Sequence, residues 1–149
     1  MYAESLFLLG LGSFLVAHSV YIAMFGKYRT RDWRKLGPSR TLGVMAILIA
    51  LGSVLGALRH SLGPLLIAVV AYALALCGMG ISAMLAELGN PLAAIGALLF
   101  VASDATLAIS KFRGPFPGHE PLIWTTYYLA QLFIFLGVAR RHGWEHRTP

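Results

Sequence analysis

The stretch GALLFVASDATLAISKF, residues 96–112, decides how this chain folds. It is an apolar run with a single carboxylate, Asp104, near its middle. Together with the residues from position 91 onward, the run is long enough to cross a lipid bilayer as a helix. A charged side chain at the centre of a bilayer costs about 2.5–3.5 kcal/mol. Asp104 therefore predicts either a function or a partner that shields it.

The composition of the chain is typical of a membrane protein. Of its 149 residues, 58% are hydrophobic and 12% are charged, and the mean hydropathy is +0.72. A soluble domain has about 25% charged residues. The apolar residues also form long blocks rather than a short period, which predicts an all-α integral membrane protein with one transmembrane domain over residues 1–149.

Five apolar blocks are predicted to span the membrane as a helical bundle. Glycine, proline or charged residues separate them, and the predicted helices cover residues 4–25, 41–58, 62–85, 91–109 and 122–139. The first block has no preceding Lys or Arg and is too long for a signal-peptide core, so we expect a spanning helix. In the second, Gly52 and Gly56 have the GxxxG spacing that allows close helix contact.

The net charge of +6 lies mainly in the loops, which indicates orientation in a membrane rather than nucleic-acid binding. The loop at residues 26–40 and the C-terminal tail carry six and three Lys or Arg, against one and two in the loops of the other side. The positive-inside rule predicts an external N-terminus and a cytosolic C-terminus. Trp33 and Trp144 are expected near the cytosolic interface.

Few strongly polar side chains remain inside the predicted helices. They are His18, Tyr72, Ser103, Asp104, Tyr127, Tyr128 and Gln131. Burial in hydrocarbon disfavours an ionised carboxylate, so Asp104 needs a proton or a donor. We predict a polar pocket among the first, fourth and fifth helices, in which a protonated Asp104 acts as a general acid. The alternative is a buried hydrogen bond from Asp104 to a histidine or tyrosine that only fixes helix packing.

The remaining motifs do not point to another kind of chemistry. Four further histidines lie in loops or the tail, without the spacing of a metal site: His60, His119, His142 and His146. The sequence has no Gly-x-Ser-x-Gly nucleophile motif and no phosphate-cradling loop.

Three stretches resemble the YhhN/TMEM86 family of membrane lysoplasmalogenases. Residues 96–112 resemble the family signature, FLVAHSVYIAMF at residues 14–25 its histidine-containing helix, and WTTYYLAQLFIFLG at residues 124–137 its last helix. Their order and spacing also match. The resemblance implies hydrolysis of the vinyl ether bond of lysoplasmalogens to a fatty aldehyde and a glycerophospho-base. It implies neither a metal nor an organic cofactor. The binding partners that it implies for this chain are a lysophospholipid substrate and membrane lipids.

The resemblance also implies the roles of individual residues. Asp104 is expected to be the acid, with His18 as the second catalytic residue. Four residues are expected to contact the substrate: Tyr21, Ser103, Tyr127 and Gln131. Apart from the resemblance, we expect Lys111, or Arg113, in the predicted outer loop to meet the headgroup phosphate, although topology and solvation explain these two cations equally well.

Members of the family have about eight helices, and the resemblance implies that the first three have no counterpart in these 149 residues. Those helices carry a Gly-Asp motif that is expected to share the site, and no Gly-Asp pair occurs here. A misassigned start site, a fragment and a degenerate member are three explanations. A degenerate member would be a non-catalytic membrane protein that assembles with itself or with another chain. A small proton-linked transporter using Asp104 and His18 ranks last. We expect a bacterial inner membrane as the location.

Overall fold

The computed structural model describes residues 2–30 and 37–143, which form five long α-helices and one short 3-10 helix. The helices are α1 (Tyr2–Gly26), α2 (Pro38–Leu58), η2 (Gly63–Leu65), α3 (Leu66–Leu85), α4 (Leu92–Arg113) and α5 (His119–Arg141). All five α-helices contain a segment long and apolar enough to cross a membrane. The predicted all-α, five-helix membrane fold is therefore confirmed. Trp33 and Trp144, which were predicted to lie near the cytosolic interface, fall outside the described residues.

Several helix ends differ from the sequence-based expectation, and α2, for instance, begins at Pro38 rather than at position 41. Lys111, expected in a loop, lies in the last turn of α4, because nothing breaks the helix before Gly114, which has a φ of 110°. α3 begins at Leu66 rather than at position 62, because Gly63 has a φ of 48° and places Pro64 in η2. α5 begins at His119, so Pro121 lies in its first turn, where proline is tolerated.

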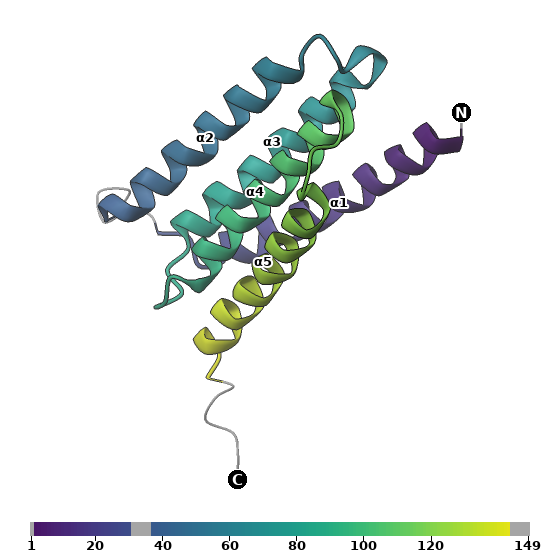
Figure 1. The fold of residues 1–149 in the computed structure, drawn as a ribbon. Coiled ribbons are helices and arrows are strands. Elements are labelled where there is room, and N and C mark those ends of the chain that lie inside the picture. Colours follow the sequence, from purple (N-terminus) through teal and green to yellow (C-terminus); the bar gives the residue numbers. More distant parts are fainter. Residues whose placement is uncertain (1, 31–36, 144–149) are drawn as a thin grey trace.

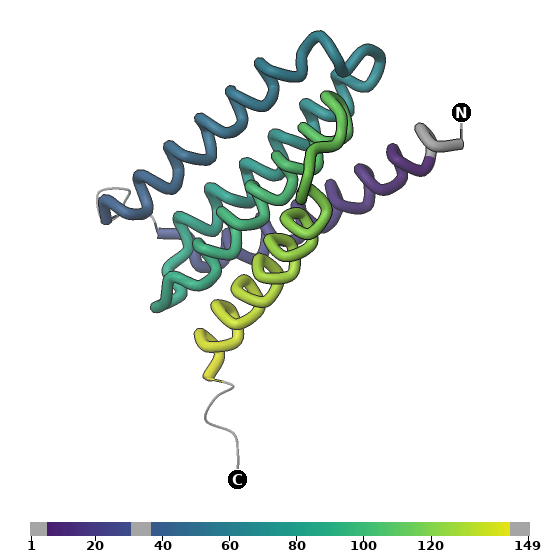
Figure 2. Tube along the Cα trace, viewed as in Figure 1, coloured from purple at the N-terminus to yellow at the C-terminus, as the bar shows by residue number. Residues whose placement is uncertain are grey.

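The helices are arranged around α3 and α4, which lie side by side at the centre (Figure 1). α2 covers one edge of this pair, and α5 packs along α4. α1 crosses on the far side and makes its main backbone approach to α3 (Figure 2). Consequently α4 has α3, α2 and α5 as neighbours, and a side chain at its middle can meet residues from several helices.

Two glycines allow α4 and α5 to pack closely. A Cβ atom at Gly96 would lie 2.7 Å from the Ala130 carbonyl oxygen, and one at Gly137 would lie 2.6 Å from the Ala93 nitrogen. By contrast, no described atom lies within 4 Å of a Cβ placed at Gly52 or at Gly56, beyond their own helix and chain neighbours. The expected close contact through the GxxxG pair of α2 is therefore not seen, since these glycines face outward.

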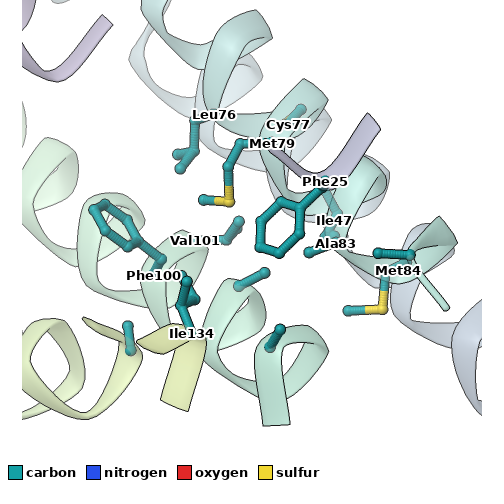
Figure 3. Close-up of a cluster of buried hydrophobic side chains, with 14 of the residues drawn as sticks. Phe25, Ile47, Leu76, Cys77, Met79, Ala83, Met84, Phe100, Val101 and Ile134 are labelled. Carbon is teal, nitrogen blue, oxygen red and sulfur yellow. The ribbon is translucent and has the colours of Figure 1, made fainter. Parts of the chain in front are cut away.

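The core is a cluster of buried side chains that all five helices contribute (Figure 3). Its largest fully buried members include Phe25, Ile47, Met79, Phe100 and Ile134. The outer surface is also apolar. Leu6, Leu9, Val16, Val20, Ile67 and Leu74 are each more than half exposed. Apolar residues inside and outside are what a bundle with lipid as its solvent requires.

Polar contacts fasten the end of the bundle at which α1, α3 and α5 terminate. The Arg40 guanidinium donates hydrogen bonds to the carbonyl oxygens of Met84 (3.3 Å) and Ala86 (3.0 Å), which closes the end of α3. The Tyr28 hydroxyl and the Nε2 of His142 lie 2.9 Å apart and join the ends of α1 and α5. This is the end that the charge distribution of the sequence predicts to face the cytosol.

Candidate functional site

Asp104 lies at the middle of α4 and is 9% exposed. It belongs to the buried face of this helix, which also holds Gly96, Ala97, Phe100, Val101 and Ser103. Its carboxylate oxygen Oδ2 accepts a hydrogen bond from the hydroxyl of Tyr72 on α3. A buried carboxylate is thus paired with a neutral donor from the neighbouring helix, as a polar group at this depth requires.

Ser103, the residue before Asp104, points toward a different helix. It is 1% exposed, and its Oγ donates a 3.0 Å hydrogen bond to the carbonyl oxygen of Ile123 on α5. Successive residues of an α-helix are about 100° apart around its axis, so neighbouring residues reach different partners. The Ser103 hydroxyl therefore joins α4 to α5 while Asp104 is bonded to α3.

His18 is fully buried on α1, beside the Tyr72–Asp104 pair. Its Nδ1 lies 2.5 Å from the carbonyl oxygen of Phe14, and because a carbonyl only accepts, Nδ1 carries the proton. In the neutral imidazole Nε2 is then an acceptor, and no described residue donates to it. The imidazole packs edge-to-face on Tyr72 and Phe100, at centroid distances of 5.4 and 5.1 Å. His18 therefore contacts the ring of the tyrosine that holds Asp104.

Neither Tyr127 nor Gln131, the two predicted site residues of the last helix, forms a described hydrogen bond with Asp104. Gln131 accepts a 2.7 Å hydrogen bond from the Tyr21 hydroxyl, which joins α5 to α1. Both residues line a separate cavity of about 310 Å³ between α1 and α5. Tyr127 packs edge-on against Phe100 and Phe14, at 5.5 and 6.2 Å. It reaches the neighbourhood of Asp104 through aromatic packing only.

An apolar cavity of about 130 Å³ opens beside Asp104, between α1, α3 and α4. Tyr72 and Asp104 line it at one level, and Lys111 lines it further along α4. Its apolar walls include Phe7, Leu11, Phe14, Val69, Leu107 and Phe112. The seven residues from Asp104 to Lys111 correspond to about 10 Å along a helix axis. The Nζ of Lys111 lies 5.3 Å from the centroid of the Phe7 ring.

The geometry brings together Asp104 and Lys111 in one cavity, with His18 next to it behind Tyr72. The predicted pocket among the first, fourth and fifth helices differs in two respects: α3 supplies the hydrogen-bond donor, and no described residue of α5 lines the cavity beside Asp104. Tyr72 was visible in the sequence as a polar group inside an apolar run, but nothing in the sequence singled it out from the other tyrosines. The arrangement has the elements of an acid site for an amphiphile: a buried carboxyl group, apolar walls and a cation at one end.

Comparison with known proteins agrees with the resemblance seen in the sequence. The profile of the YhhN family matches residues 1–138. Lysoplasmalogenase TMEM86B of Sus scrofa is 36% identical over 135 residues, which are 90% of this chain and 54% of that protein. A lysoplasmalogenase of Mycobacterium tuberculosis is 35% identical over 138 residues, 88% of this chain and 50% of that protein.

A third relative is lysoplasmalogenase TMEM86A of Bos taurus, which is 33% identical over 154 aligned positions that cover 98% of this chain and 59% of that protein. No protein of solved structure matches significantly. The chain spans about half the length of the curated relatives it matches. The family profile covers nearly the whole chain, and the five apolar helices agree with membrane-protein relatives. This integral membrane protein belongs to the YhhN family.

Proposed function

We propose that this chain is a membrane-embedded hydrolase that cleaves the vinyl ether bond of lysoplasmalogens. The products are a fatty aldehyde and a glycerophospho-base. The observation that carries the proposal is the buried Asp104 carboxyl group in an apolar cavity that ends at Lys111. The names of the relatives, which are lysoplasmalogenases from mammals and mycobacteria, support the choice of reaction.

The dimensions of the cavity suit the substrate. In a lysoplasmalogen, six bonds separate the phosphorus from the vinyl carbon attached to oxygen, a span of roughly 8 Å when extended. The rise from Asp104 to Lys111 is about 10 Å, and the lysine side chain covers the difference. Lys111 thus binds the phosphate while the vinyl ether lies beside Asp104.

The reaction begins with a proton transfer from Asp104 to the vinyl carbon that is not bonded to oxygen. The Tyr72 hydroxyl occupies Oδ2, which leaves Oδ1 to carry the proton. The carbon–carbon double bond supplies the electron pair, and the positive charge is shared between the other vinyl carbon and the ether oxygen. Aromatic side chains in the cavity wall, such as Phe14 and Tyr72, stabilise this oxocarbenium ion.

Water completes the reaction. It adds to the oxocarbenium carbon, and the Asp104 carboxylate takes back a proton from it. The resulting hemiacetal loses its hydroxyl proton as the glycerol oxygen receives one, so the carbon–oxygen bond breaks and the aldehyde leaves. Asp104 serves as acid and base in turn. His18 acts as a positioning residue, because its ring packs on Tyr72 and it does not line the cavity among the described residues.

Aldehyde release from a lysoplasmalogen by membranes that contain the chain tests this function. We expect release by the wild type and at least a hundredfold loss for Asp104→Asn, which cannot donate an acidic proton. Thr106→Val is the matched control, because the Thr106 hydroxyl donates its hydrogen bond to the Ala102 carbonyl oxygen of its own helix. Equal release by Asp104→Asn and wild type would exclude Asp104 as the acid. Absence of release by the wild type would exclude the hydrolase function for this chain.

We further infer that the chain lies in a bacterial inner membrane, with its N-terminus outside. The imbalance of Lys and Arg between the loops of the two sides supports this orientation. Ser61→Cys and Glu87→Cys place thiols at exposed positions at opposite ends of the bundle. We expect an impermeant maleimide to label position 61 in intact cells and position 87 only after permeabilisation. The reverse pattern would invert the orientation.

A further inference from the structure

A second cavity lies on the other side of the Tyr72–Asp104 pair. It has a volume of about 60 Å³ and is bounded by α2, α3 and α4. Val69, Tyr72, Asp104 and Ala108 line both this cavity and the one that ends at Lys111. The carboxyl group therefore separates two apolar spaces rather than closing the end of one.

A third cavity continues the second along α2 and α4. It has a volume of about 170 Å³ and shares Ala50, Val101 and Ala105 with the second cavity. We call this third cavity the α2–α4 groove. Its lining residues are Ala46, Ile47, Ala50, Leu98, Val101, Ala102 and Ala105. The three cavities thus form a row along α4 from Lys111, past Asp104, to Leu98, about 20 Å by helical rise.

The α2–α4 groove is chemically suited to a single hydrocarbon chain. All seven of its lining residues are aliphatic, and four of them are alanines, which leave room between the two helices. Ala46 and Ala102 are exposed at its outer edge, so a chain that lies in the groove can continue into the surrounding lipid. The order of the row is cation, carboxyl group, apolar groove, which corresponds to phosphate, vinyl ether and hydrocarbon chain in an ether lysolipid.

We propose that the α2–α4 groove binds the part of the alkenyl chain that follows the vinyl ether. This inference rests on the proposed function, since it locates the chain relative to Asp104. Six residues separate Leu98 from Asp104, or about 9 Å of helical rise. That length holds about seven carbons of an extended chain, at roughly 1.3 Å per carbon. The groove thus selects a single unbranched chain near the reacting bond, and the remaining carbons lie in the lipid.

A photoreactive lysolipid tests the location of the chain without requiring turnover. The probe is a 1-O-alkyl lysophosphatidylcholine, which lacks the cleavable double bond and carries a diazirine at the seventh carbon of its alkyl chain. We expect crosslinks to peptides that contain residues 46–50 or 98–105. An unlabelled alkyl lysolipid is expected to compete, whereas a diacyl phosphatidylcholine is not. Equal competition by the diacyl lipid would identify the groove as a site for bulk lipid and overturn the proposal.

A substitution that fills the groove provides the matched variant. Ala102→Leu keeps a strong helix former at an exposed position, and the larger side chain occupies the space between α2 and α4. We expect at least a fivefold loss of groove crosslinking. Ala71→Leu, at an exposed position of α3 that lines none of the three cavities, should retain it. Unchanged crosslinking in Ala102→Leu, or labelling of α1 instead, would overturn the proposal.

The two levels of proposal fail separately. If the wild type releases aldehyde but the probe does not crosslink to the groove, the proposed hydrolase function stands and the alkenyl chain of the substrate binds elsewhere. If the groove is labelled specifically but no aldehyde is released, the protein binds ether lysolipids without hydrolysing them. The groove is then not part of a substrate complex, and the inference fails. Aldehyde release together with specific groove labelling is the result expected.

Discussion

Tyr72 on α3 donates its hydroxyl hydrogen to the carboxylate of Asp104 on α4. The two residues lie on helices that meet at the centre of the bundle, and both line the cavities on either side of them. The hydrogen bond therefore fixes the orientation of the carboxyl group between these two cavities.

Removing this hydroxyl is expected to affect turnover more than binding. A hydrogen bond to a charged group contributes about 1.5–3 kcal/mol, so we expect Tyr72→Phe to lower kcat by at least about tenfold. KM should change little, because Tyr72→Phe keeps the ring in the cavity wall. Steady-state aldehyde release provides both constants. Tyr128→Phe is the control, since Tyr128 is 64% exposed on α5. A change in KM alone would show that Tyr72 acts in binding.

His18 offers a test of positioning against direct catalysis. His18→Phe retains an aromatic ring for packing on Tyr72 and Phe100 and removes the unpaired Nε2. An unpaired buried polar atom costs about 1–3 kcal/mol, so we expect a more stable protein that keeps more than half of its activity. Thermal unfolding in detergent and aldehyde release measure the two effects. Loss of activity as severe as that of Asp104→Asn would make His18 a catalytic residue.

Lys111 and Arg113 are both cations in the last turn of α4, but only Lys111 lines the cavity among the described residues. We expect Lys111→Met to raise KM for a lysoplasmalogen about tenfold and to leave KM for a phosphate-free alkenylglycerol unchanged. Arg113→Met is expected to alter neither. The comparison of the two substrates isolates the phosphate contact. An equal effect of both substitutions would indicate that the charges act on membrane orientation rather than on the substrate.

The glycines of α4 and α5 are expected to differ sharply from those of α2 when replaced by alanine. Gly96→Ala and Gly137→Ala place a methyl group within 3 Å of the opposing backbone, and overpacking of this kind costs about 1–3 kcal/mol. Gly52→Ala meets open space, so the better helix propensity of alanine should stabilise the helix by up to about 1 kcal/mol. Thermal unfolding in detergent measures all three. Equal destabilisation by Gly52→Ala would reveal a contact that the monomer does not show.

Arg40 is expected to stabilise the end of α3. Its guanidinium is the donor to the carbonyl oxygens of Met84 and Ala86, and loss of hydrogen bonds from a charged donor costs about 1.5–3 kcal/mol. We expect Arg40→Ala to accelerate amide hydrogen exchange in residues 83–88. Arg59→Ala is the control, because Arg59 is exposed and donates to the neighbouring His60. Unchanged exchange in Arg40→Ala would show that the carbonyls are satisfied without it.

The sequence predicted the helices and the central carboxylate because both follow from the lipid environment. Five long apolar blocks have no other stable form in a bilayer, and Asp104 stands out from its apolar surroundings. The partner of Asp104 was not predictable, since α3 is apolar on every face and the pattern does not show which way Tyr72 points. The pattern likewise does not show which glycines face another helix, so the outward-facing Gly52 and Gly56 could not be distinguished from Gly96 and Gly137 at the α4–α5 contact. α4 continues to Arg113 and α5 begins at His119, so both helices extend beyond their apolar blocks. In these polar residues, hydropathy does not show whether the chain is helical.

The paired bonds of Ser103 and Asp104 have a mechanical consequence. Ser103 fastens α4 to the backbone of α5, and Asp104 fastens the same turn to Tyr72 of α3. Because these two hydrogen bonds come from adjacent residues about 100° apart around the helix axis, together they oppose rotation of α4 about that axis. No comparable side-chain bond joins α2 to α4 within the described residues. Of the three helices that pack on α4, α2 is therefore the one that can separate from it without the loss of a side-chain hydrogen bond to α4.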